Sequence, residues 1–518
     1  MNILADFAAG VARHPERIAI IDRHGRRTSY AELDARAAAL AGAWTAQGLA
    51  AGDRVLLAVA LDADLYAALA ALWSIGAVAV FPEPALGLAG LKHAVRATNP
   101  RGLLVNGLYR LLLLVPAIRR ISLKLNAHPP SSRRRPGPIN SELEDDARCL
   151  QYSSGDIALM GPGFRRDDGE SGGRGEPTGC AHLPPHHPAL ISFTSGSTGT
   201  PKSIVRSHGF LAAQDRAVAP LIAGDGEIDL VAFPVFVVAN LGQGITSLLP
   251  NWSLRAPAKA KGAAIRTHAE RHGVTRLLLS PAIAEALAKS GMPAGVHTLF
   301  TGGGPVFPDL IARIRAATPK LRIVSVYGST EAEPIAHSDA ADVTPADWVA
   351  MRAGAGLLAG TPAEAARVRI VDDEILVAGE HVVKSYLDPA HDITTKLRDA
   401  DGIVWHRTGD GGRFDAEGRL WLRGRIGGRV GGLWPFEVEA PARFWPGVRG
   451  AALGQAAGTA VLAIEGDVRH LAAWRAAGLA LGVDRVIAVS AIPVDRRHGS
   501  KIDQARLDTI IRKTRAIG

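Results

Sequence analysis

Short apolar runs alternate with longer Ala-rich segments over the first hundred residues. Three of the runs have the composition of buried strands: 17–22, 54–60 and 78–83. Ser29 and Glu32 stand at capping-box spacing before one Ala-rich segment, and a second such segment, 62–77, ends near Gly76, so both are predicted to be helices. This repeated alternation of strand and helix predicts a parallel sheet with helices on its faces.

The apolar pattern is lost between residues 127 and 188. Pro, Gly, Arg and Asp dominate this segment, which cannot bury enough apolar surface to offset the entropy lost on ordering, so we predict a disordered insertion. Strand and helix patterns alternate again from Ala189 to residue 325. Shorter strands separated by turns follow over 366–425, and residues 426–518 return to alternation.

These changes of pattern predict an α/β protein with two domains. The first, residues 1–425, combines parallel α/β subdomains with a small β-barrel-like part made of the shorter strands, and it carries the insertion. The second, residues 426–518, is predicted to be a small α+β domain. A chain of 518 residues, 47% of them hydrophobic, is long enough to form two domains with large cores.

The sequence contains no segment that resembles a membrane span or a signal peptide. The apolar segment at 108–118 is too short to cross a bilayer, contains Arg110 and runs into Arg119, so we predict a buried strand or helix there. The N-terminus lacks a basic region followed by an apolar core. Cys149 and Cys180 have no paired spacing. These features predict a cytoplasmic protein without stable membrane insertion.

The charge distribution bears on the class of ligand. The formal net charge is +9, but the basic residues are scattered along the chain, and only 5% of residues are aromatic. Nucleic-acid binding would require a basic stripe with interleaved aromatic side chains, so no nucleic-acid partner is predicted. An excess of positive charge suits an anionic small-molecule substrate.

Residues 191–202, ISFTSGSTGTPK, place hydroxyls, glycines and one lysine directly after an apolar run. The backbone N–H groups of glycines can approach a phosphate closely, hydroxyls donate further hydrogen bonds, and Lys202 adds a mobile positive charge. The segment therefore predicts a phosphate-binding loop. It does not match the GxxxxGK[ST] pattern of the P-loop, and taken alone it would also fit an ordinary surface turn.

Five motifs in order resemble those of the adenylate-forming superfamily, which includes acyl-CoA synthetases, peptide-synthetase adenylation domains and luciferases. They are TSGSTGTPK (194–202), GGGP (302–305), YGSTE (327–331), HRTGD (406–410) with GRLWLRGR (418–425), and PVDRRHGSKID (493–503). The resemblance covers nearly the whole chain outside the insertion. It implies activation of a carboxylic acid by ATP and Mg²⁺ as an acyl-adenylate, and a small C-terminal domain that moves between two reaction steps.

The resemblance also implies a role for each motif. Lys501 would reach the α-phosphate and the carboxylate, Thr330 would contact the α-phosphate, and Glu331 would bind Mg²⁺, which makes these three the predicted catalytic residues. Asp410 would bind the ribose hydroxyls, and Arg425 would contact the ribose near the hinge. The other predicted nucleotide-binding residues are Thr194, Ser195, Gly196, Ser197, Thr198, Gly199, Lys202, Gly303, Gly304, Pro305, Tyr327, Gly328 and Ser329.

The chain departs from the family pattern after Arg425. Gly427 and Gly428 stand where two acidic residues are usual, Gly431 replaces a lysine, and the loop that follows is shorter. In the family this segment faces the active site during thioester formation. The departures therefore put the use of CoA or of a carrier thiol in doubt, but they give no reason to doubt adenylation.

One subgroup of the superfamily resembles this chain in these segments. Residues 226–250, the short Gly-rich loop and the C-terminal motif resemble the olefin β-lactone synthetases and related fatty-acid ligases, which activate a β-hydroxy fatty acid whose own hydroxyl then displaces AMP. The apolar run at 232–242 is predicted to line a pocket for the alkyl chain, with Phe236, Val237 and Asn240 as pocket residues. The same run also fits a buried strand followed by a helix.

Two other interpretations stay open. The first is a fatty acyl-CoA ligase or a carrier-loading acyl-AMP ligase with an acyl-carrier partner, and it predicts that AMP release requires the thiol. The second is a nucleotide-binding homologue that has lost catalysis and would bind ATP without exchanging pyrophosphate. The presence of Lys501 and Glu331 argues against this second interpretation.

Overall fold

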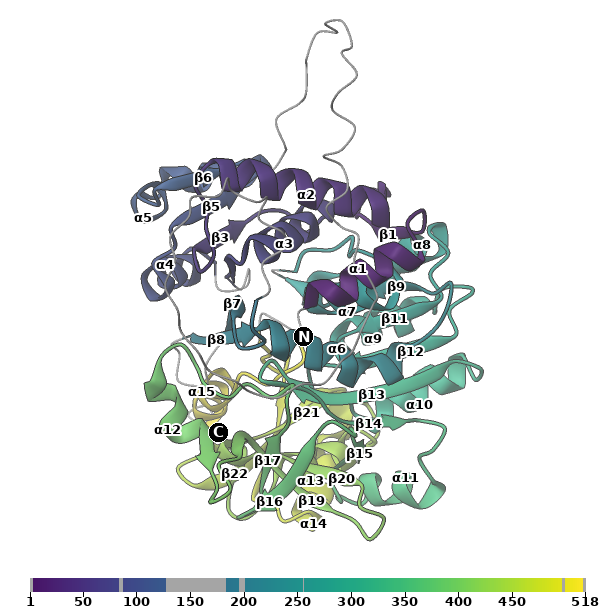
Figure 1. The fold of residues 1–518 in the computed structure, drawn as a ribbon. Coiled ribbons are helices and arrows are strands. Elements are labelled where there is room, and N and C mark those ends of the chain that lie inside the picture. Colours follow the sequence, from purple (N-terminus) through teal and green to yellow (C-terminus); the bar gives the residue numbers. More distant parts are fainter. Residues whose placement is uncertain are drawn as a thin grey trace, which may run out of the picture.

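The computed structural model describes residues 3–82, 87–126, 183–194, 201–254, 256–495 and 499–515. Residues 127–182, most of the predicted insertion, lie outside these ranges, and so do residues 195–200 of the predicted phosphate loop. The predictions for these two segments therefore stay predictions. In Figure 1 the described chain forms successive parts that follow the sequence from the purple N-terminal region to the yellow C-terminal one.

The first part is a six-stranded sheet in the order β6-β5-β3-β4-β7-β8, parallel except for the β7–β8 pair. Its strands are β3 (Arg54–Ala58), β4 (Val78–Phe81), β5 (Gly102–Val105), β6 (Leu123–Leu125), β7 (Pro188–Thr194) and β8 (Lys202–Ser207). Helices α2 (Tyr30–Ala46) and α3 (Ala63–Ile75) pack on one face, and α4 (Gly87–Thr98) and α5 (Pro116–Arg119) pack on the other. Both faces are covered by helices, which explains why the central strands β4 and β5 consist of apolar residues and glycine.

The second part is the parallel half of a 14-stranded sheet. Its parallel strands are β1 (Ile18–Ile21), β10 (Thr246–Leu248), β9 (Ile228–Val231), β11 (Arg276–Leu279), β12 (Thr298–Gly302) and β13 (Arg322–Ser329), with β2 (Arg27–Ser29) antiparallel at the edge. Helices α8 (Gly262–Arg271), α9 (Pro281–Ser290) and α10 (Pro308–Ala317) cover one face. Helices α1 (Ile3–Arg13), α6 (His208–Ile222) and α7 (Pro234–Gln243) lie on the other.

The same sheet continues beyond β13 as antiparallel strands. They are β14 (Ala332–Asp339), β15 (Leu357–Pro362), β16 (Arg367–Val371), β17 (Glu374–Ala378), β18 (Lys396–Arg398), β19 (Val404–Phe414) and β20 (Leu420–Arg425), accompanied by α11 (Pro345–Arg352) and α12 (Asp392–Thr395). These are the shorter strands that the sequence predicts as a small β-barrel-like part. Hydrogen bonds between β13 and β14 join them to the parallel strands, so residues of both halves can meet in one site.

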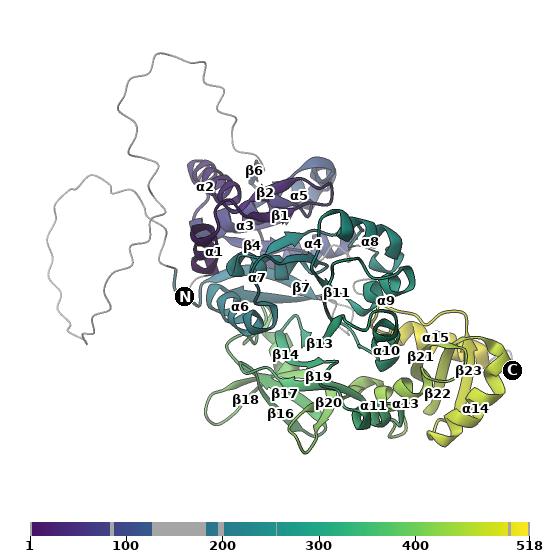
Figure 2. The ribbon, with the colours of Figure 1, turned by 90° about the vertical axis from the view of Figure 1, so that its right-hand side faces the viewer.

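The residues after Arg425 form a separate three-stranded sheet. Its strands are β21 (Val448–Ala456), β22 (Thr459–Gly466) and β23 (Arg485–Val489). Helices α13 (Pro435–Ala442) and α14 (Leu471–Ala480) pack on one face, and α15 (Gln504–Arg515) packs on the other. Figure 2 shows this yellow part beside α10, α11 and β20. The domain boundary at residue 425 stays a prediction.

Local sequence signals identified several element ends correctly. Ser29 caps α2, and its side chain and that of Glu32 form both hydrogen bonds of the capping box. Helix α3 ends at Gly76, as predicted. Both signals act within one turn of helix, so they do not depend on the rest of the fold.

The prediction for residues 108–118 was wrong in one respect. The segment forms a 3₁₀ helix over Gly107–Leu114 followed by α5, but Leu108, Leu111 and Leu114 are 86%, 65% and 80% exposed. With three residues per turn, these leucines lie on one side of the helix, and that side faces solvent. Ile118 is the residue of this segment that enters the core. In the described part of the chain, no helix is both long and apolar enough to cross a membrane.

Candidate active site

The turn between β13 and β14 lies at the junction of the parallel and antiparallel halves of the large sheet. This hairpin carries Tyr327, Gly328, Ser329, Thr330 and Glu331. Carboxyl ends of parallel strands are the usual place for ligands in α/β sheets. Here the antiparallel strands bring further side chains to the same end, and these side chains form two clusters.

The first cluster surrounds Asp410 on β19. The Tyr327 hydroxyl donates a hydrogen bond to Asp410 Oδ2 at 2.9 Å, and Arg425 Nη1 donates to Asp410 Oδ1 at 3.0 Å. Asp410 and Arg425 face each other because β19 and β20 pair in that register. Burial and the Asp410 carboxylate raise the pKa of Tyr327 well above its usual value, so Tyr327 stays a neutral donor. The cluster presents a fixed carboxylate and a cation side by side.

The second cluster surrounds Glu331. The Tyr386 hydroxyl donates to Glu331 Oε1 at 2.9 Å, and the Val383 N–H donates to the Glu331 carbonyl at 2.8 Å. Burial alone would raise the pKa of Glu331, but His406, the Tyr386 hydrogen bond and Lys396 outweigh burial and lower it. Glu331 is therefore a half-buried carboxylate that remains ionised.

The arrangement around Glu331 suits Mg²⁺. This ion is usually held by one or two carboxylates together with the phosphates of its substrate, rather than by a cage of protein ligands. A single ionised carboxylate next to the predicted phosphate loop meets that description. Bound there, Mg²⁺ would supply neutralisation of phosphate charge.

The described ends of the predicted phosphate loop, Thr194 and Lys202, lie close to these clusters. Thr194 ends β7 and Lys202 begins β8, and the two residues pair across the strands. The Lys202 ammonium lies 5.5 Å from the centre of the Tyr386 ring. Arg206 Nη2 on the same strand donates to the Thr330 carbonyl at 2.9 Å. Strand β8 therefore connects the phosphate loop to the β13–β14 turn.

The loop that carries Lys501 contacts the GGGP loop, although about two hundred residues separate them in sequence. A Cβ atom on Gly304 would lie 2.3 Å from Ser500 Oγ, so the absence of a side chain at 304 permits this contact. Lys501 is fixed at its backbone, because its N–H donates to Asp495 Oδ1 at 3.0 Å and its carbonyl accepts from the Asp495 N–H at 2.8 Å. Gly303 and Pro305 lie in the same loop, between β12 and α10.

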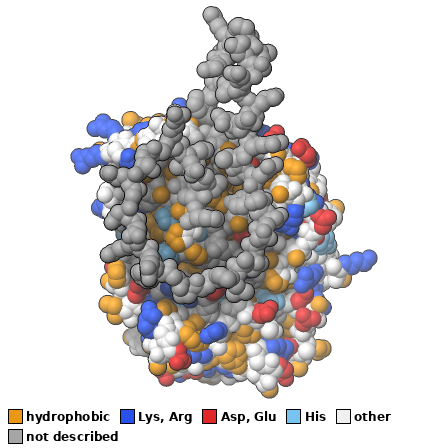
Figure 3. All heavy atoms as spheres, viewed as in Figure 1, with side chains coloured by type: hydrophobic (Ala, Val, Ile, Leu, Met, Phe, Trp, Pro, Cys, Tyr) orange, Lys and Arg blue, Asp and Glu red, His pale blue; other side chains and the backbone are white. Residues whose placement is uncertain are grey.

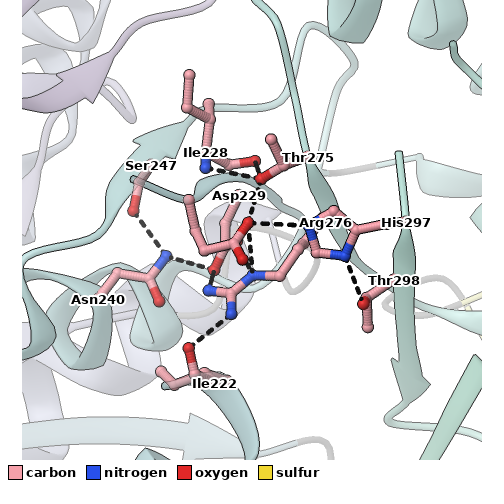
Figure 4. Close-up of polar contacts among 10 residues, drawn as sticks. Ile222, Ile228, Asp229, Asn240, Ser247, Thr275, Arg276, His297 and Thr298 are labelled. Carbon is pink, nitrogen blue, oxygen red and sulfur yellow. Dashed lines mark hydrogen bonds and ion pairs between the residues drawn. The ribbon is translucent and has the colours of Figure 1, made fainter. Parts of the chain in front are cut away.

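The predicted pocket residues lie on α7, but in different surroundings. Asn240 is fully buried, and its Nδ2 donates to Asp229 Oδ2 at 3.1 Å and to Ser247 Oγ at 3.0 Å. Figure 4 shows this network, in which Arg276 Nε also donates to Asp229 Oδ1 at 2.7 Å. The Asn240 side chain thus has structural partners in the core. Val237 is also fully buried, whereas Phe236 is half-buried, and the pocket role of all three stays a prediction.

Three residues near Glu331 were missed by the sequence analysis: Tyr386, Lys396 and His406. Tyr386 is bridged to Ile204 of β8, and Lys396 pairs with His406 across β18 and β19. His406 was quoted inside the HRTGD motif but was given no role, and the segment around Lys396 carries no motif. Their position depends on antiparallel pairing between strands that are separated by turns, which the sequence pattern does not specify.

The chain matches the model of the family described as AMP-binding enzyme over residues 7–387. It is 30% identical to an olefin beta-lactone synthetase of Xanthomonas campestris pv. campestris, over 98% of this chain and 97% of that protein. It is 31% identical to an olefin beta-lactone synthetase of Stenotrophomonas maltophilia, over 92% and 90% of the two chains.

The fold is also that of an O-succinylbenzoate coenzyme A synthetase from Bacillus subtilis, solved in complex with ATP and magnesium. The TM-score is 0.71 at 19% identity, over 97% of this chain and 98% of that one. Members of this family use ATP and typically Mg²⁺, which agrees with the clusters around Asp410 and Glu331. The chain belongs to the family of AMP-binding enzymes and is an AMP-forming ligase.

Proposed function

We propose that this ligase activates a fatty acid, in the specific case a β-hydroxy fatty acid, as its acyl-adenylate, and that the β-hydroxyl then closes a β-lactone. The observation that carries the proposal is the similarity to two olefin beta-lactone synthetases along at least 92% of this chain. That similarity includes the residues after Arg425, where the chain departs from the pattern of thioester-forming relatives.

The segment after Arg425 packs against the strand that carries Asp410. The buried indole of Trp434 lies against Gly411, where a Cβ atom would come within 2.1 Å of its ring. The guanidinium groups of Arg423 and Arg429 lie 4.6 and 5.0 Å from the centre of the same ring. The shortened segment is therefore packed beside Asp410 by cation–π contacts. A reaction in which the substrate supplies its own nucleophile needs no thiol at this place.

The proposed chemistry has two steps. In the first, a carboxylate oxygen attacks the α-phosphorus of ATP, the bond to the β-phosphate breaks, and pyrophosphate leaves. Two anions must meet, so positive charge and positioning determine the barrier. Lys202 and Lys501 supply charge in this proposal, Thr330 contacts the α-phosphate and Asp410 holds the ribose. In the second step the β-hydroxyl oxygen attacks the acyl carbon, its proton passes to solvent, and AMP leaves.

A paired-substrate experiment tests the proposal. The purified enzyme is incubated with ATP, Mg²⁺ and either a β-hydroxy fatty acid or the unsubstituted acid of the same chain length, with no thiol present. Both acids should support pyrophosphate exchange, because both have a carboxylate. The hydroxy acid alone should give continuous AMP release and a β-lactone, identified by mass spectrometry.

The Lys501→Ala variant is the matched negative control, since it should lose most pyrophosphate exchange and keep the fold. AMP release that requires added CoA with both acids would replace the lactone proposal by the acyl-CoA ligase interpretation. Failure of every fatty acid to support exchange, with exchange on another class of acid, would overturn the proposed substrate.

A further inference from the structure

Lys396 is a half-buried lysine next to Tyr386 and His406, and no motif assigns it a role. It is the first residue of β18, and the pairing of β18 with β19 places it opposite His406. Its ammonium group donates to the Val383 carbonyl, and it lies 3.2 Å from His406 Nδ1. Burial and the nearby Lys396 charge lower the pKa of His406 to about 4, and His406 Nδ1 also lies 3.2 Å from the Thr395 carbonyl.

Lys396 and Lys202 approach the same aromatic ring. Their ammonium groups lie 5.2 and 5.5 Å from the centre of the Tyr386 ring. The hydroxyl of that ring is bonded to Glu331. Lys396 therefore lies near both the last residue of the phosphate loop and the carboxylate expected to hold Mg²⁺, although it belongs to neither motif.

Side chains of both signs surround this ring. Besides Lys202 and Lys384, the acidic residues Glu331 and Asp392 lie in the surroundings of Lys396. Burial, offset in part by Glu331 and Asp392, lowers the pKa of Lys396 to about 8. A phosphate group bound between Lys202 and Lys396 would favour the charged form of Lys396.

We propose that Lys396 is a phosphate-binding residue that contacts the β- and γ-phosphates of ATP and the pyrophosphate formed from them. The position argues for these phosphates rather than for the nucleoside. Asp410, Tyr327 and Arg425 form the separate cluster predicted to hold the ribose. The ring of Tyr386, between Lys396 and Lys202, lies on the side of the phosphate loop.

Titration of wild type and variants with ATP, AMP and pyrophosphate by isothermal calorimetry, at fixed Mg²⁺, tests this assignment. AMP lacks the two phosphates in question, so it reports on the rest of the site. Lys396→Met should weaken ATP and pyrophosphate binding about 10- to 100-fold, as expected for loss of a charge-assisted hydrogen bond. AMP binding should change less than about twofold, because the nucleoside contacts remain.

Two further variants separate charge from local packing. Lys396→Gln keeps a polar end that can bond the Val383 carbonyl, and it should show the same selective loss as Lys396→Met. Lys384→Met is the matched control: Lys384 is exposed and its ammonium donates to the Gly379 carbonyl, so its removal should leave the ratio of ATP affinity to AMP affinity unchanged. Thermal unfolding of each variant establishes that it is folded.

The proposal is overturned if Lys396→Met and Lys396→Gln both weaken the binding of ATP and of AMP equally, or if neither variant weakens the binding of ATP. Equal weakening would make Lys396 a positioning residue for Glu331 and Tyr386. The proposal rests on the nucleotide half of the proposed function, and the two fail differently. If the wild type binds no ATP, both are wrong. If the wild type binds ATP and the Lys396 variants do not lose more affinity for ATP than for AMP, only the Lys396 assignment is wrong.

Discussion

Single residues at this site depend on their neighbours for their chemical state. Glu331 is half-buried yet ionised, because nearby basic groups and a hydroxyl compensate for the loss of water. Tyr327 is half-buried and neutral, because desolvation and a carboxylate both disfavour its ionised form. Desolvation and neighbouring charge thus keep Glu331 ionised and Tyr327 neutral.

A substitution at Glu331 tests its role as the predicted Mg²⁺ ligand. Glu331→Gln keeps an oxygen that can accept the Tyr386 hydrogen bond but removes the negative charge. We expect a higher Mg²⁺ concentration for half-maximal pyrophosphate exchange and a loss of roughly 10- to 100-fold in rate, as for other charge-assisted contacts. Circular dichroism should show an unchanged fold. An unaltered Mg²⁺ dependence would remove Glu331 from the metal site.

Contacts between elements bring the two ends of the site together. The loop after β12 and the loop before α15 meet where Gly304 leaves room for Ser500. Close by, Arg443 Nε, just after α13, donates to Asp309 Oδ1 of α10 at 2.7 Å, and the Arg443 guanidinium stacks 4.4 Å from the centre of the Phe307 ring. These contacts hold the residues after Arg425 in the orientation that places Lys501 beside the GGGP loop.

Replacement of Gly304 tests this contact. In Gly304→Ala the new Cβ would lie 2.3 Å from Ser500 Oγ and 3.0 Å from Ser500 Cβ, so rotation of the hydroxyl relieves only part of the overlap and the Lys501 loop must shift. We expect slower pyrophosphate exchange, by about tenfold or more, because catalysis is sensitive to displacements of about 1 Å. The double variant Gly304→Ala/Ser500→Gly removes the colliding side chain and should recover most of the rate. A double variant as slow as Gly304→Ala would show that the alanine acts on the nucleotide instead.

At the scale of the whole molecule, basic residues are scattered along the chain rather than gathered in one stretch. On the face seen in Figure 3, Lys and Arg side chains lie interspersed with acidic ones outside the grey atoms. Several acidic groups are instead buried inside the fold and affect its stability. Asp215 of α6 is 5% exposed and accepts a hydrogen bond from Gln243 Nε2 at 3.1 Å, close to Asp6 of α1.

Asp215 makes stability depend on pH. Burial, together with the Asp6 charge, raises the pKa of Asp215 from 3.8 to about 7. The unfolded chain releases this proton near pH 4 and the folded chain near pH 7, so folding is penalised increasingly between these values and fully above pH 7. Asp215→Asn removes the penalty, worth up to about 4 kcal/mol. Its melting temperature should exceed that of wild type at pH 8 and approach it at pH 4.5; an equal difference at both would contradict this assignment.

The sequence alone determined the family, the order of the motifs and much of the local structure. Capping residues, strand runs and the glycine that ends α3 act over a few positions, so they can be read without the fold. The motifs led to Tyr327, Glu331, Asp410 and Lys501 for the same reason. Each combines residue types whose chemistry suits a nucleotide, at short spacing along the chain.

The tertiary structure decided which side chains meet. Antiparallel pairing of β18 with β19 placed Lys396 and His406 beside Glu331, and no local pattern specified that pairing. It also placed Asn240 in a buried network with Asp229, and it left the leucines at 108, 111 and 114 in solvent although their run is apolar. Hydrophobic periodicity states which residues prefer burial, but the partner that buries them, and the register of distant strands, follow from the packing of the whole chain.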